Sequence, residues 1–535
     1  MMASRNQKIR EKLINSFGSV KDEGFSFEFI ENYFRKKKHV DILQSISDKT
    51  WNDLDFQEFY MFADRTTSAI GQQCLYSRLR NISNHNFNEK VFENLIDKFL
   101  NDREFRLKIQ IELCKLSCKE AFYISSLFQD EHIKQPKWLF IARILSAASL
   151  ISLVLLFFNP AIIFVLFAVV VINFGIHYWN KNNLTPYIES LPQLLKLNSV
   201  AKELYKNVEL QSIDRELDEP IAIIDKIRNR MTLFKFEAKL QGDMEALAWG
   251  ILEFFKIIFL VEPILLFNVL NQLDTKRKEI EKVYEFVGQV DILISIASLR
   301  KGLDLWCKPN ICTEAKNLLA EEIYHPLIPN CIRNSIEINN KSVLLTGSNM
   351  SGKTSFIRTI GLNVIAGLTL NTCFAQKFLF PLSRVFSAIR ISDDLLNDKS
   401  YYFEEVLTIK EMIGNSLNGS LNLFLLDEIF KGTNTVERIS AGKAVLSALN
   451  KDGNLVFVST HDIELADLLK DEFELYHFSE TVNHQTVDFD YKLKEGKLKN
   501  RNAIQILQLN GYPKKVIEEA LSLSVKMDKA RLNFE

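Results

Sequence analysis

A glycine-rich segment constrains this chain more than any other feature. Residues 347–355 read GSNMSGKTS, a complete G-x-x-x-x-G-K-[S/T] motif. The preceding run SVLLT predicts a buried strand, and the residues from Lys353 onward predict a helix. Backbone N–H groups of such a loop, together with the positive end of the helix dipole, suit phosphate groups. The motif in this setting predicts a nucleotide site in an α/β domain and is favoured over a glycine-rich connector.

The motif assigns a role to each of its residues. We expect Lys353 to reach the β- and γ-phosphates of ATP, and the Thr354 hydroxyl to ligate Mg²⁺. The rest of the motif is expected to surround the phosphates: Gly347, Ser348, Asn349, Met350, Ser351, Gly352 and Ser355.

Two acidic residues end a later apolar run. Residues 422–429 read NLFLLDEI, which predicts a strand that ends in Asp427 and Glu428. We expect Asp427 to hold Mg²⁺ and Glu428 to act as the general base that polarises the attacking water. A buried strand with two incidental acids is the alternative, and the phosphate loop upstream disfavours it.

A third strand pattern ends in a histidine. Residues 455–461 read LVFVSTH, so His461 follows the strand that comes after the acidic pair. This position favours a catalytic contact of His461 with the γ-phosphate or the water over a structural role. The segment Lys431–Thr435 follows the acidic pair directly and is well placed to touch a neighbouring subunit.

The most apolar stretch of the chain runs from Trp138 to Trp179. It consists of two runs, 138–158 and 160–179, joined at Asn159-Pro160, and Arg143 is its only formally charged residue. Each run has about 20 residues, the length of one bilayer crossing, and Asn-Pro favours a turn. We therefore predict a transmembrane helical hairpin over 134–181; a buried hairpin of a large soluble core is the alternative.

The residues that flank this hairpin predict its orientation. Lys134, Lys137 and Lys181 lie at the same end, which the positive-inside rule places in the cytoplasm. We expect a multi-pass protein of the cell inner (cytoplasmic) membrane with both polar arms cytoplasmic. A second apolar stretch, 246–270, contains Glu253, Lys256 and Glu262, and is predicted to be a soluble helix rather than a third span.

The remaining sequence predicts helices followed by an α/β domain. Residues 1–133 and 182–320 have helical periodicity, for example over 56–80, 213–240 and 274–299, whereas 321–535 alternates short strands with helices. The net charge of −1 indicates no global attraction to nucleic acid. The seven cysteines lack C-x-x-C spacing, which disfavours a zinc site.

Taken together, these motifs resemble the MutS mismatch-repair ATPases of the ABC-type ATPase superfamily. The resemblance is most specific in Asn349-Met350, in DEIFKGTNT (427–435) and in STHDIEL (459–465). It is looser at 391–405, which resembles the family's signature loop with Ser400 as its serine, and at 491–520, which resembles its closing segment. Looser matches also include His325-Pro326 and 331–335 at the entry to the ATPase domain, and 64–79 at the start of the helical core.

The resemblance implies a fold and a mechanism. An ATPase domain would follow a MutS-like helical core and lever, which the hairpin interrupts. In a homodimer, ATP would lie between the Lys353 loop of one subunit and the Ser400 loop of the other. The family's adenine-packing aromatic residue corresponds to Cys331 here, and its Ser-Thr signature becomes Ser400-Tyr401. No mismatch-recognition domain is found in the sequence, which suggests a membrane-anchored MutS-like branch.

Two functions follow from these expectations. In the first, an ATP-driven clamp binds DNA, including mismatched DNA, and basic helices such as 215–239 face the phosphates. In the second, a membrane-bound ATP switch acts on an unidentified protein partner without mismatch recognition. An ABC transporter is disfavoured because two spans are few for a translocation path and the LSGGQ signature is absent.

Overall fold

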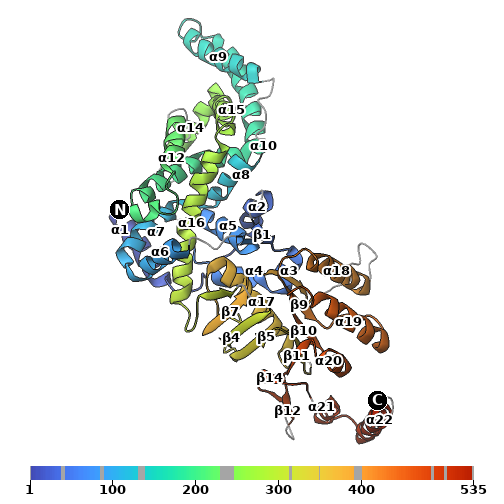
Figure 1. Ribbon diagram of the computed structural model, residues 1–535. Coiled ribbons are helices and arrows are strands. Elements are labelled where there is room, and N and C mark those ends of the chain that lie inside the picture. The colour runs from blue at the N-terminus through green and yellow to red at the C-terminus, as the bar shows by residue number, and fades with distance from the viewer. Residues whose placement is uncertain are drawn as a thin grey trace. The chain divides into compact units, whose positions relative to one another are not determined.

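The computed structural model divides into two compact units (Figure 1). The helical unit contains residues 1–40, 63–78 and 85–302, and the α/β unit contains 41–62, 79–84 and 303–535. The structure describes residues 2–37, 42–84, 89–130, 139–228, 246–312, 316–348, 350–390, 401–482, 487–498 and 503–532.

The helical unit is built around one long buried helix, α16 (Arg277–Lys301). The side chains of Val290–Arg300 are all buried, so α16 is covered on every face along this stretch. The first part of the unit is made of α1 (Met2–Ser16), α2 (Phe27–Lys36), α6 (Glu89–Asn101), α7 (Arg103–Leu113), η1 (Cys114–Leu116), η2 (Lys119–Ser125) and α8 (Ser126–Gln129). The second part is made of α9 (Leu139–Leu155), α10 (Ile162–Tyr205), α11 (Val208–Gln211), α12 (Asp218–Arg228), α14 (Ala246–Phe259) and α15 (Val261–Asp274).

The helical structure expected over 56–80 is present as two helices rather than one. The segment forms α4 (Phe56–Ala63) and α5 (Ala69–Arg80), with Asp64–Ser68 between them. The buried carboxylate of Asp291 in α16 accepts hydrogen bonds from Thr67 N (2.8 Å) and Ser68 N (2.7 Å). A side chain from a distant helix therefore fixes the two residues before α5, and Ser68 Oγ caps α5 by accepting a hydrogen bond from Gly71 N at 2.9 Å. Similarly, the helix expected over 213–240 begins only at Asp218, and 229–245 lie outside the described residues.

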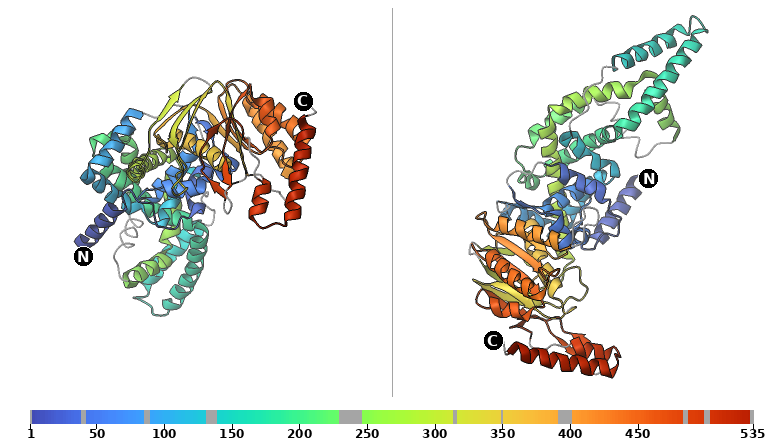
Figure 2. Two further views of the ribbon diagram at one scale, coloured as in Figure 1. Left: turned by 90° about the horizontal axis from the view of Figure 1, so that it is seen from below. Right: turned by 90° about the vertical axis from the view of Figure 1, so that its right-hand side faces the viewer.

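Helices α9 and α10 form an antiparallel pair that joins at Asn159-Pro160, as predicted (Figures 1 and 2). Asn159 Oδ1 accepts a hydrogen bond from Ala161 N at 3.0 Å and stabilises the turn. The second helix does not end at Trp179 but continues to Tyr205. Among the described residues, one helical window, Ile162–Trp179, is long and apolar enough to cross a membrane, whereas Leu139–Leu155 is shorter. The two-span hairpin therefore stays a prediction, and Trp138 lies outside the described residues.

The stretch 246–270 forms two helices rather than one. Leu260 adopts φ 45° between α14 and α15, a left-handed conformation that ends α14. Glu253 and Lys256 in α14 are buried, and Glu253 lies 3.2 Å from His177 of α10. The charged groups of Glu253 and Lys256 thus lie in helix contacts, as expected for a helix packed in a core.

The α/β unit contains a six-stranded sheet with the order β14-β11-β6-β10-β9-β8. Its central strands are parallel, and only β14 is antiparallel to its neighbour. The strands are β6 (Ser342–Thr346), β8 (Arg384–Ala388), β9 (Asn422–Asp427), β10 (Leu455–Thr460), β11 (Phe473–His477) and β14 (Lys494–Glu495). β6 and β10 are buried along their full length, as expected for parallel strands covered on both faces.

Helices cover both faces of this sheet. On one face, Leu344, Phe424 and Leu426 pack into a core with α18 (Tyr401–Ser416), α19 (Thr435–Leu449) and α20 (Ile463–Leu469). On the other face, α17 (Lys353–Leu370) packs so closely that a Cβ at Gly361 would lie 2.3 Å from Leu425 Cδ1. The α/β domain predicted from the sequence is therefore confirmed as a mostly parallel sheet with helices on both faces.

A second sheet extends the α/β unit toward the N-terminus. Its order is β3-β7-β4-β5, made of β3 (Pro309–Cys312), β7 (Lys377–Pro381), β4 (Asn317–Ile323) and β5 (Asn334–Asn339). The C-terminal segment of the α/β unit begins at Leu303 rather than at the expected residue 321. The reason is that β3 and β4 pair with strands that follow residue 321. Shorter elements complete it: α3 (Asp48–Asp53), the pairs β1 (Ile42–Ser45) with β2 (Asn81–Ser83) and β12 (Glu480–Val482) with β13 (Val487–Phe489), α21 (Ala503–Leu509) and α22 (Lys514–Leu532).

Candidate functional site

The phosphate loop turns sharply between β6 and α17. Gly352 has φ 108°, and Met350 has φ 69°, both in the left-handed region. A Cβ at Gly347 would lie 2.8 Å from Phe478 O and 2.9 Å from Ser351 Oγ, so the loop leaves no space for a side chain there. Ser348 Oγ donates a hydrogen bond to Glu480 Oε2 at 2.7 Å, whereas Asn349 lies outside the described residues.

Lys353 lies at the start of α17 with its ammonium group directed back over the loop. Its Nζ donates hydrogen bonds to Gly347 O (2.9 Å) and Ser348 O (2.8 Å). Burial lowers the pKa of Lys353, although Glu428 and Asp427 act in the opposite direction. The ammonium group of Lys353 thus lies against the backbone of the phosphate loop, a position that suits it to bind the β- and γ-phosphates of ATP.

Thr354 and Asp427 meet as the sequence predicts for a Mg²⁺ site. Thr354 Oγ1 donates a hydrogen bond to Asp427 Oδ2 at 2.7 Å, and Ser459 Oγ donates one to Asp427 Oδ1. Hydroxyl and carboxylate oxygens are hard ligands of the kind Mg²⁺ prefers, usually one or two from the protein with phosphate and water completing the set. The buried Ser351 Oγ has no hydrogen-bond partner among the described residues, so a polar ligand is needed to satisfy it. The residues therefore fit Mg·ATP.

Glu428 lies directly after β9 in a constrained conformation. Its φ is 53°, and its N–H donates a hydrogen bond to Ser459 O at 3.0 Å. A non-glycine residue with positive φ is strained and is found most often where function requires it. The carboxylate lies 2.5 Å from His461 Nε2 and 2.7 Å from Lys431 Nζ, so the structure brings the predicted base and the predicted histidine together.

The charge of Glu428 is set by competing effects. Burial raises its pKa, but the hydrogen bonds and positive charges of His461 and Lys431 outweigh burial and lower the pKa to about 2. The carboxylate is therefore ionised at any pH at which the protein works. Its neighbour Lys431 was expected only to contact another subunit, and its ion pair with Glu428 was not predicted.

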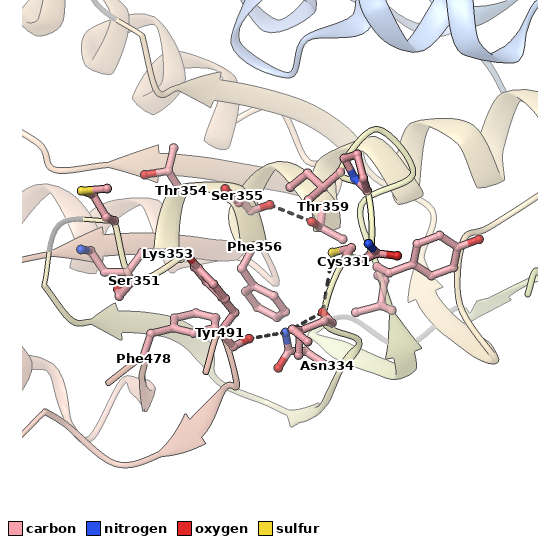
Figure 3. A pocket seen from close by; sticks show the side chains of 18 of the residues that line it. Cys331, Asn334, Ser351, Lys353, Thr354, Ser355, Phe356, Thr359, Phe478 and Tyr491 are labelled. Atoms are coloured by element: carbon pink, nitrogen blue, oxygen red, sulfur yellow. Dashed lines mark hydrogen bonds between the residues drawn. The ribbon is translucent and has the colours of Figure 1, made fainter. Parts of the chain in front are cut away.

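A cavity of about 540 Å³ opens beside the loop (Figure 3). It is lined by Met350–Phe356 and Glu428, and also by Tyr324, Cys331, Asn334, Phe478 and Tyr491 among others. Its size suits a nucleotide. The lining includes both the phosphate loop and aromatic residues. The cavity therefore offers contacts for the phosphates and for the base of a nucleotide.

Sequence reasoning missed Tyr491 and Asn334 as pocket residues. Asn334 Nδ2 donates a hydrogen bond to Tyr491 O (3.1 Å), and Asn334 Oδ1 accepts one from Leu493 N (2.8 Å), which fixes the turn that carries Tyr491. A Cβ at Gly352 would lie 3.3 Å from the Tyr491 ring, so the ring lies against the phosphate loop. Tyr491 thus provides an aromatic surface in a pocket where Cys331 stands at the expected aromatic position.

Two further residues complete the account of the predicted site. Glu405 of α18 accepts a hydrogen bond from Phe430 N, which follows Glu428 and also has a positive φ of 60°. Glu405 therefore supports the turn after β9, and no local motif pointed to it. Ser400, the predicted signature serine, lies outside the described residues.

Comparison with known proteins identifies related sequences. Residues 343–528 match the model of MutS domain V. The DNA mismatch repair protein MutS of Aquifex pyrophilus is 30% identical over 266 residues, 47% of this chain and 30% of that protein. DNA mismatch repair protein MSH3 of Saccharomyces cerevisiae is 27% identical over 300 residues, 53% of this chain and 29% of that protein. MutS of Thermotoga petrophila is 28% identical over 316 residues, 56% of this chain and 38% of that protein.

The matched region thus spans about a third of the length of these curated relatives, between 29% and 38%. The matches show similarity to MutS proteins, and residues 343–528 of the C-terminal α/β unit match domain V of that family.

The Lys431–Glu428 ion pair predicts a specific pH dependence. In the wild type, acidification to pH 5 leaves Glu428 ionised because its pKa is about 2. Lys431→Met removes a hydrogen bond and a positive charge that lower this pKa, so the pKa rises and protonation begins at higher pH. We expect the acid limb of single-turnover ATP hydrolysis to shift upward.

Lys443→Met is the matched control, because Lys443 pairs with Glu472 rather than with the cavity residues. Superimposable pH profiles for the wild type and Lys431→Met would show that Lys431 does not set the charge of Glu428.

Proposed function

We propose that this chain, whose matches support membership of the MutS family, is a Mg²⁺-dependent ATPase. The observation that carries the proposal is the convergence of Lys353, the Thr354–Asp427 pair and Glu428 around one cavity. No single contact is specific to ATP hydrolysis, but a phosphate-binding cation, a Mg²⁺ ligand pair and an ionised base together are what phosphoryl transfer to water requires.

The side chains have distinct tasks in this mechanism. Lys353 exchanges its bonds to the loop carbonyls for bonds to phosphate oxygens, and the N–H groups of the loop and of α17 hold the remaining charge. Thr354 and Asp427 hold Mg²⁺, which neutralises charge on the β- and γ-phosphates when bound. Tyr491 stacks on the base.

The base is positioned by its neighbours. Glu428 orients the attacking water and accepts its proton, while His461 Nε2, 2.5 Å from the carboxylate, fixes the orientation of that carboxylate and lies within reach of the γ-phosphate.

A homodimer with a composite site is the proposed assembly. Met350 at the mouth of the cavity is 82% exposed, and Lys431 is also accessible, so both are available to a second copy. In this arrangement the partner's copy of Ser400 completes the site. ATP binding closes the dimer, hydrolysis reopens it, and the helical unit carries the motion as a lever.

Two substitutions test the proposed ATPase. Lys353→Ala removes the cation for the phosphates and is expected to weaken ATP binding roughly 10- to 100-fold, as for loss of a charge-assisted hydrogen bond. Glu428→Ala leaves the phosphate contacts in place and is expected to slow hydrolysis roughly 10²- to 10⁴-fold, with ATP bound in a closed dimer.

Calorimetric titration and single-turnover hydrolysis measure the two effects separately, and size-exclusion chromatography with light scattering measures the dimer. Full turnover by the purified Glu428→Ala protein would refute Glu428 as the base. Unchanged affinity of Lys353→Ala would refute the assigned phosphate site.

We also propose that the assembled protein binds DNA, including mismatched DNA. The support is the similarity to relatives that are named DNA mismatch repair proteins. A salt titration of binding to homoduplex and heteroduplex DNA tests the proposal by fluorescence anisotropy. Binding that weakens steeply with salt is expected if basic side chains contact phosphates. Equal, negligible binding at low salt would exclude a DNA clamp and favour an ATP switch that acts on a protein partner.

A membrane anchor is the second part of the proposal, with the polar arms of the chain on the cytoplasmic side. It is supported by large apolar side chains that are exposed along α9, along α10 and in the turn between them. These include Phe140 (68%), Phe157 (88%), Phe158 (82%), Phe164 (78%) and Phe167 (70%). Exposed apolar surface of this extent on one helical pair indicates contact with lipid or with another apolar surface. Lipid is favoured because the Ile162–Trp179 window is only 11% buried and has a mean hydropathy of 2.2.

Flotation with liposomes tests the anchor. The wild-type chain is expected to float and to resist extraction by alkaline carbonate. Phe164→Asp with Phe167→Asp is expected to weaken the association strongly, because each acidic side chain costs roughly 2.5–3.5 kcal/mol in the bilayer. Val208→Asp, at a 76% exposed site in α11, is the control. Failure of the wild-type chain to float would contradict the anchor.

A further inference from the structure

Three consecutive residues from the end of α3 to the start of α4, Asp53-Leu54-Asp55, make contacts that the proposed mechanism does not use. We call them the DLD turn. They belong to the α/β unit although they precede its main part by about 250 residues of chain. Ser47 caps α3, with its side chain accepting a hydrogen bond from Thr50 N at 3.2 Å, so the turn follows a short fixed helix.

Asp53 binds the end of β8. It is only 1% exposed, and its carboxylate accepts hydrogen bonds from Ser387 Oγ (2.7 Å), Ile389 N (3.0 Å) and Arg390 N (3.0 Å). β8 is the edge strand of the six-stranded sheet, where backbone groups lack a further strand as a partner. Asp53 supplies that partner, so the end of β8 is held by a side chain from the N-terminal part of the chain.

Leu54 packs against the phosphate-loop helix. It is fully buried, and a Cβ added at Gly361 of α17 would lie 3.1 Å from its methyl carbons. α17 and Leu54 are therefore in close contact, and a movement of α17 at this point displaces Leu54 directly.

Asp55 forms ion pairs with two elements: α17, which Leu54 also contacts, and the segment after β8, which Asp53 also contacts. Its Oδ2 lies 3.1 Å from Arg358 Nη1 in α17, and its Oδ1 lies 2.7 Å from Arg390 Nη1, just after β8. Arg358 comes one helical turn after Thr354, on the helix that begins at Lys353. One carboxylate thus connects the helix that holds the phosphates with the segment that leaves the sheet edge.

The chain continues from the DLD turn into the helical unit. Helix α4 starts at Phe56 in the α/β unit, and its last residue, Ala63, begins the next segment of the helical unit. The non-helical segment Asp64–Ser68 follows α4, and the hydrogen bonds of Thr67 N and Ser68 N to Asp291 fix it in place. A displacement of the turn can therefore pass along α4 to this fixed segment.

We propose that the DLD turn couples the nucleotide site to the helical unit, with Asp55 as the residue that positions Arg358 and Arg390. The inference rests on the proposed ATPase function and deepens it. When phosphates replace the loop carbonyls on Lys353, the start of α17 shifts. The Asp55–Arg358 and Leu54–Gly361 contacts pass the shift to the turn, and α4 carries it onward.

The electrostatics of Arg358 agree with this role. Burial lowers its pKa and Asp55 acts against that effect, so the guanidinium depends on Asp55 for a counter-charge. The two ion pairs are only partly exposed at Asp55 (23%) and Arg358 (17%), whereas Arg390 is 53% exposed. The pair with Arg358 is therefore the less screened of the two.

Asp55→Asn is a suitable test substitution. Asp55 has φ 54°, a conformation that asparagine tolerates as well as aspartate does, so the backbone of the turn is retained. The change removes only the charge shared by the two arginines. Asp55 does not line the nucleotide cavity, so a loss of coupling is separable from a loss of ATP binding.

The experiment combines ATP binding with hydrogen–deuterium exchange of the full chain. In the wild type, ATP is expected to change deuterium uptake in α17 and also in residues 64–78 of the helical unit. In Asp55→Asn, ATP affinity is expected to stay within about twofold of the wild type, and uptake in α17 still changes. The ATP-dependent change at residues 64–78 is lost.

Two controls accompany the variant. Glu58→Gln, on the next turn of α4 and exposed, keeps the full wild-type response. Asp55→Asn combined with Arg358→Gln is expected to be no worse than Asp55→Asn alone, since both changes break the same contact.

An unchanged response at residues 64–78 in Asp55→Asn would overturn the inference, and so would a loss of ATP binding in that variant. If the wild type binds ATP but residues 64–78 show no response, the coupling fails and the ATPase proposal stands. If the wild type binds no ATP, both fail.

Discussion

Strand β10 lies between β6 and β9 and pairs in parallel with both, with Thr460 opposite Thr346 and Ser459 opposite Asp427. The carboxyl ends of three strands therefore meet at one edge of the sheet. The residues that follow each strand lie at this edge: the phosphate loop after β6, Glu428 after β9 and His461 after β10. The hydrogen bonds from Thr354 to Asp427 and from Ser459 to Asp427 join the three strand ends, so the geometry of the site depends on this register.

The same edge concentrates charge in a partly buried space. Glu428 is kept ionised by His461 and Lys431, while burial opposes the charge on Lys353 and on Glu428 alike. The loop carbonyls are partners of Lys353, and the carboxylate of Glu428 is a partner of Lys431 and His461. Phosphate groups would bring negative charge to the cations, and Mg²⁺ would bring positive charge to the carboxylates. Ligand binding and rearrangement of these contacts are therefore linked.

The sequence predicted those features that depend on neighbouring residues. The strand–loop–helix motif, the acidic pair and the strand before His461 are local patterns, and the structure brings Lys353, Thr354, Asp427, Glu428 and His461 together. Tyr491, Asn334, Glu405 and the DLD turn were not predicted, because their contacts join segments far apart in the chain. The break at Asp64–Ser68 was missed for the same reason, since the carboxylate of Asp291 that binds this segment lies more than 200 residues away.

A structure of the full chain bound to Mg·ATP is the decisive measurement. We expect the γ-phosphate at Lys353, the metal on Thr354 and Asp427, the base against Tyr491, and Lys353 released from Gly347 O and Ser348 O. A nucleotide bound elsewhere, or bound here with the Thr354–Asp427 hydrogen bond and the Lys353 contacts unchanged, would contradict it.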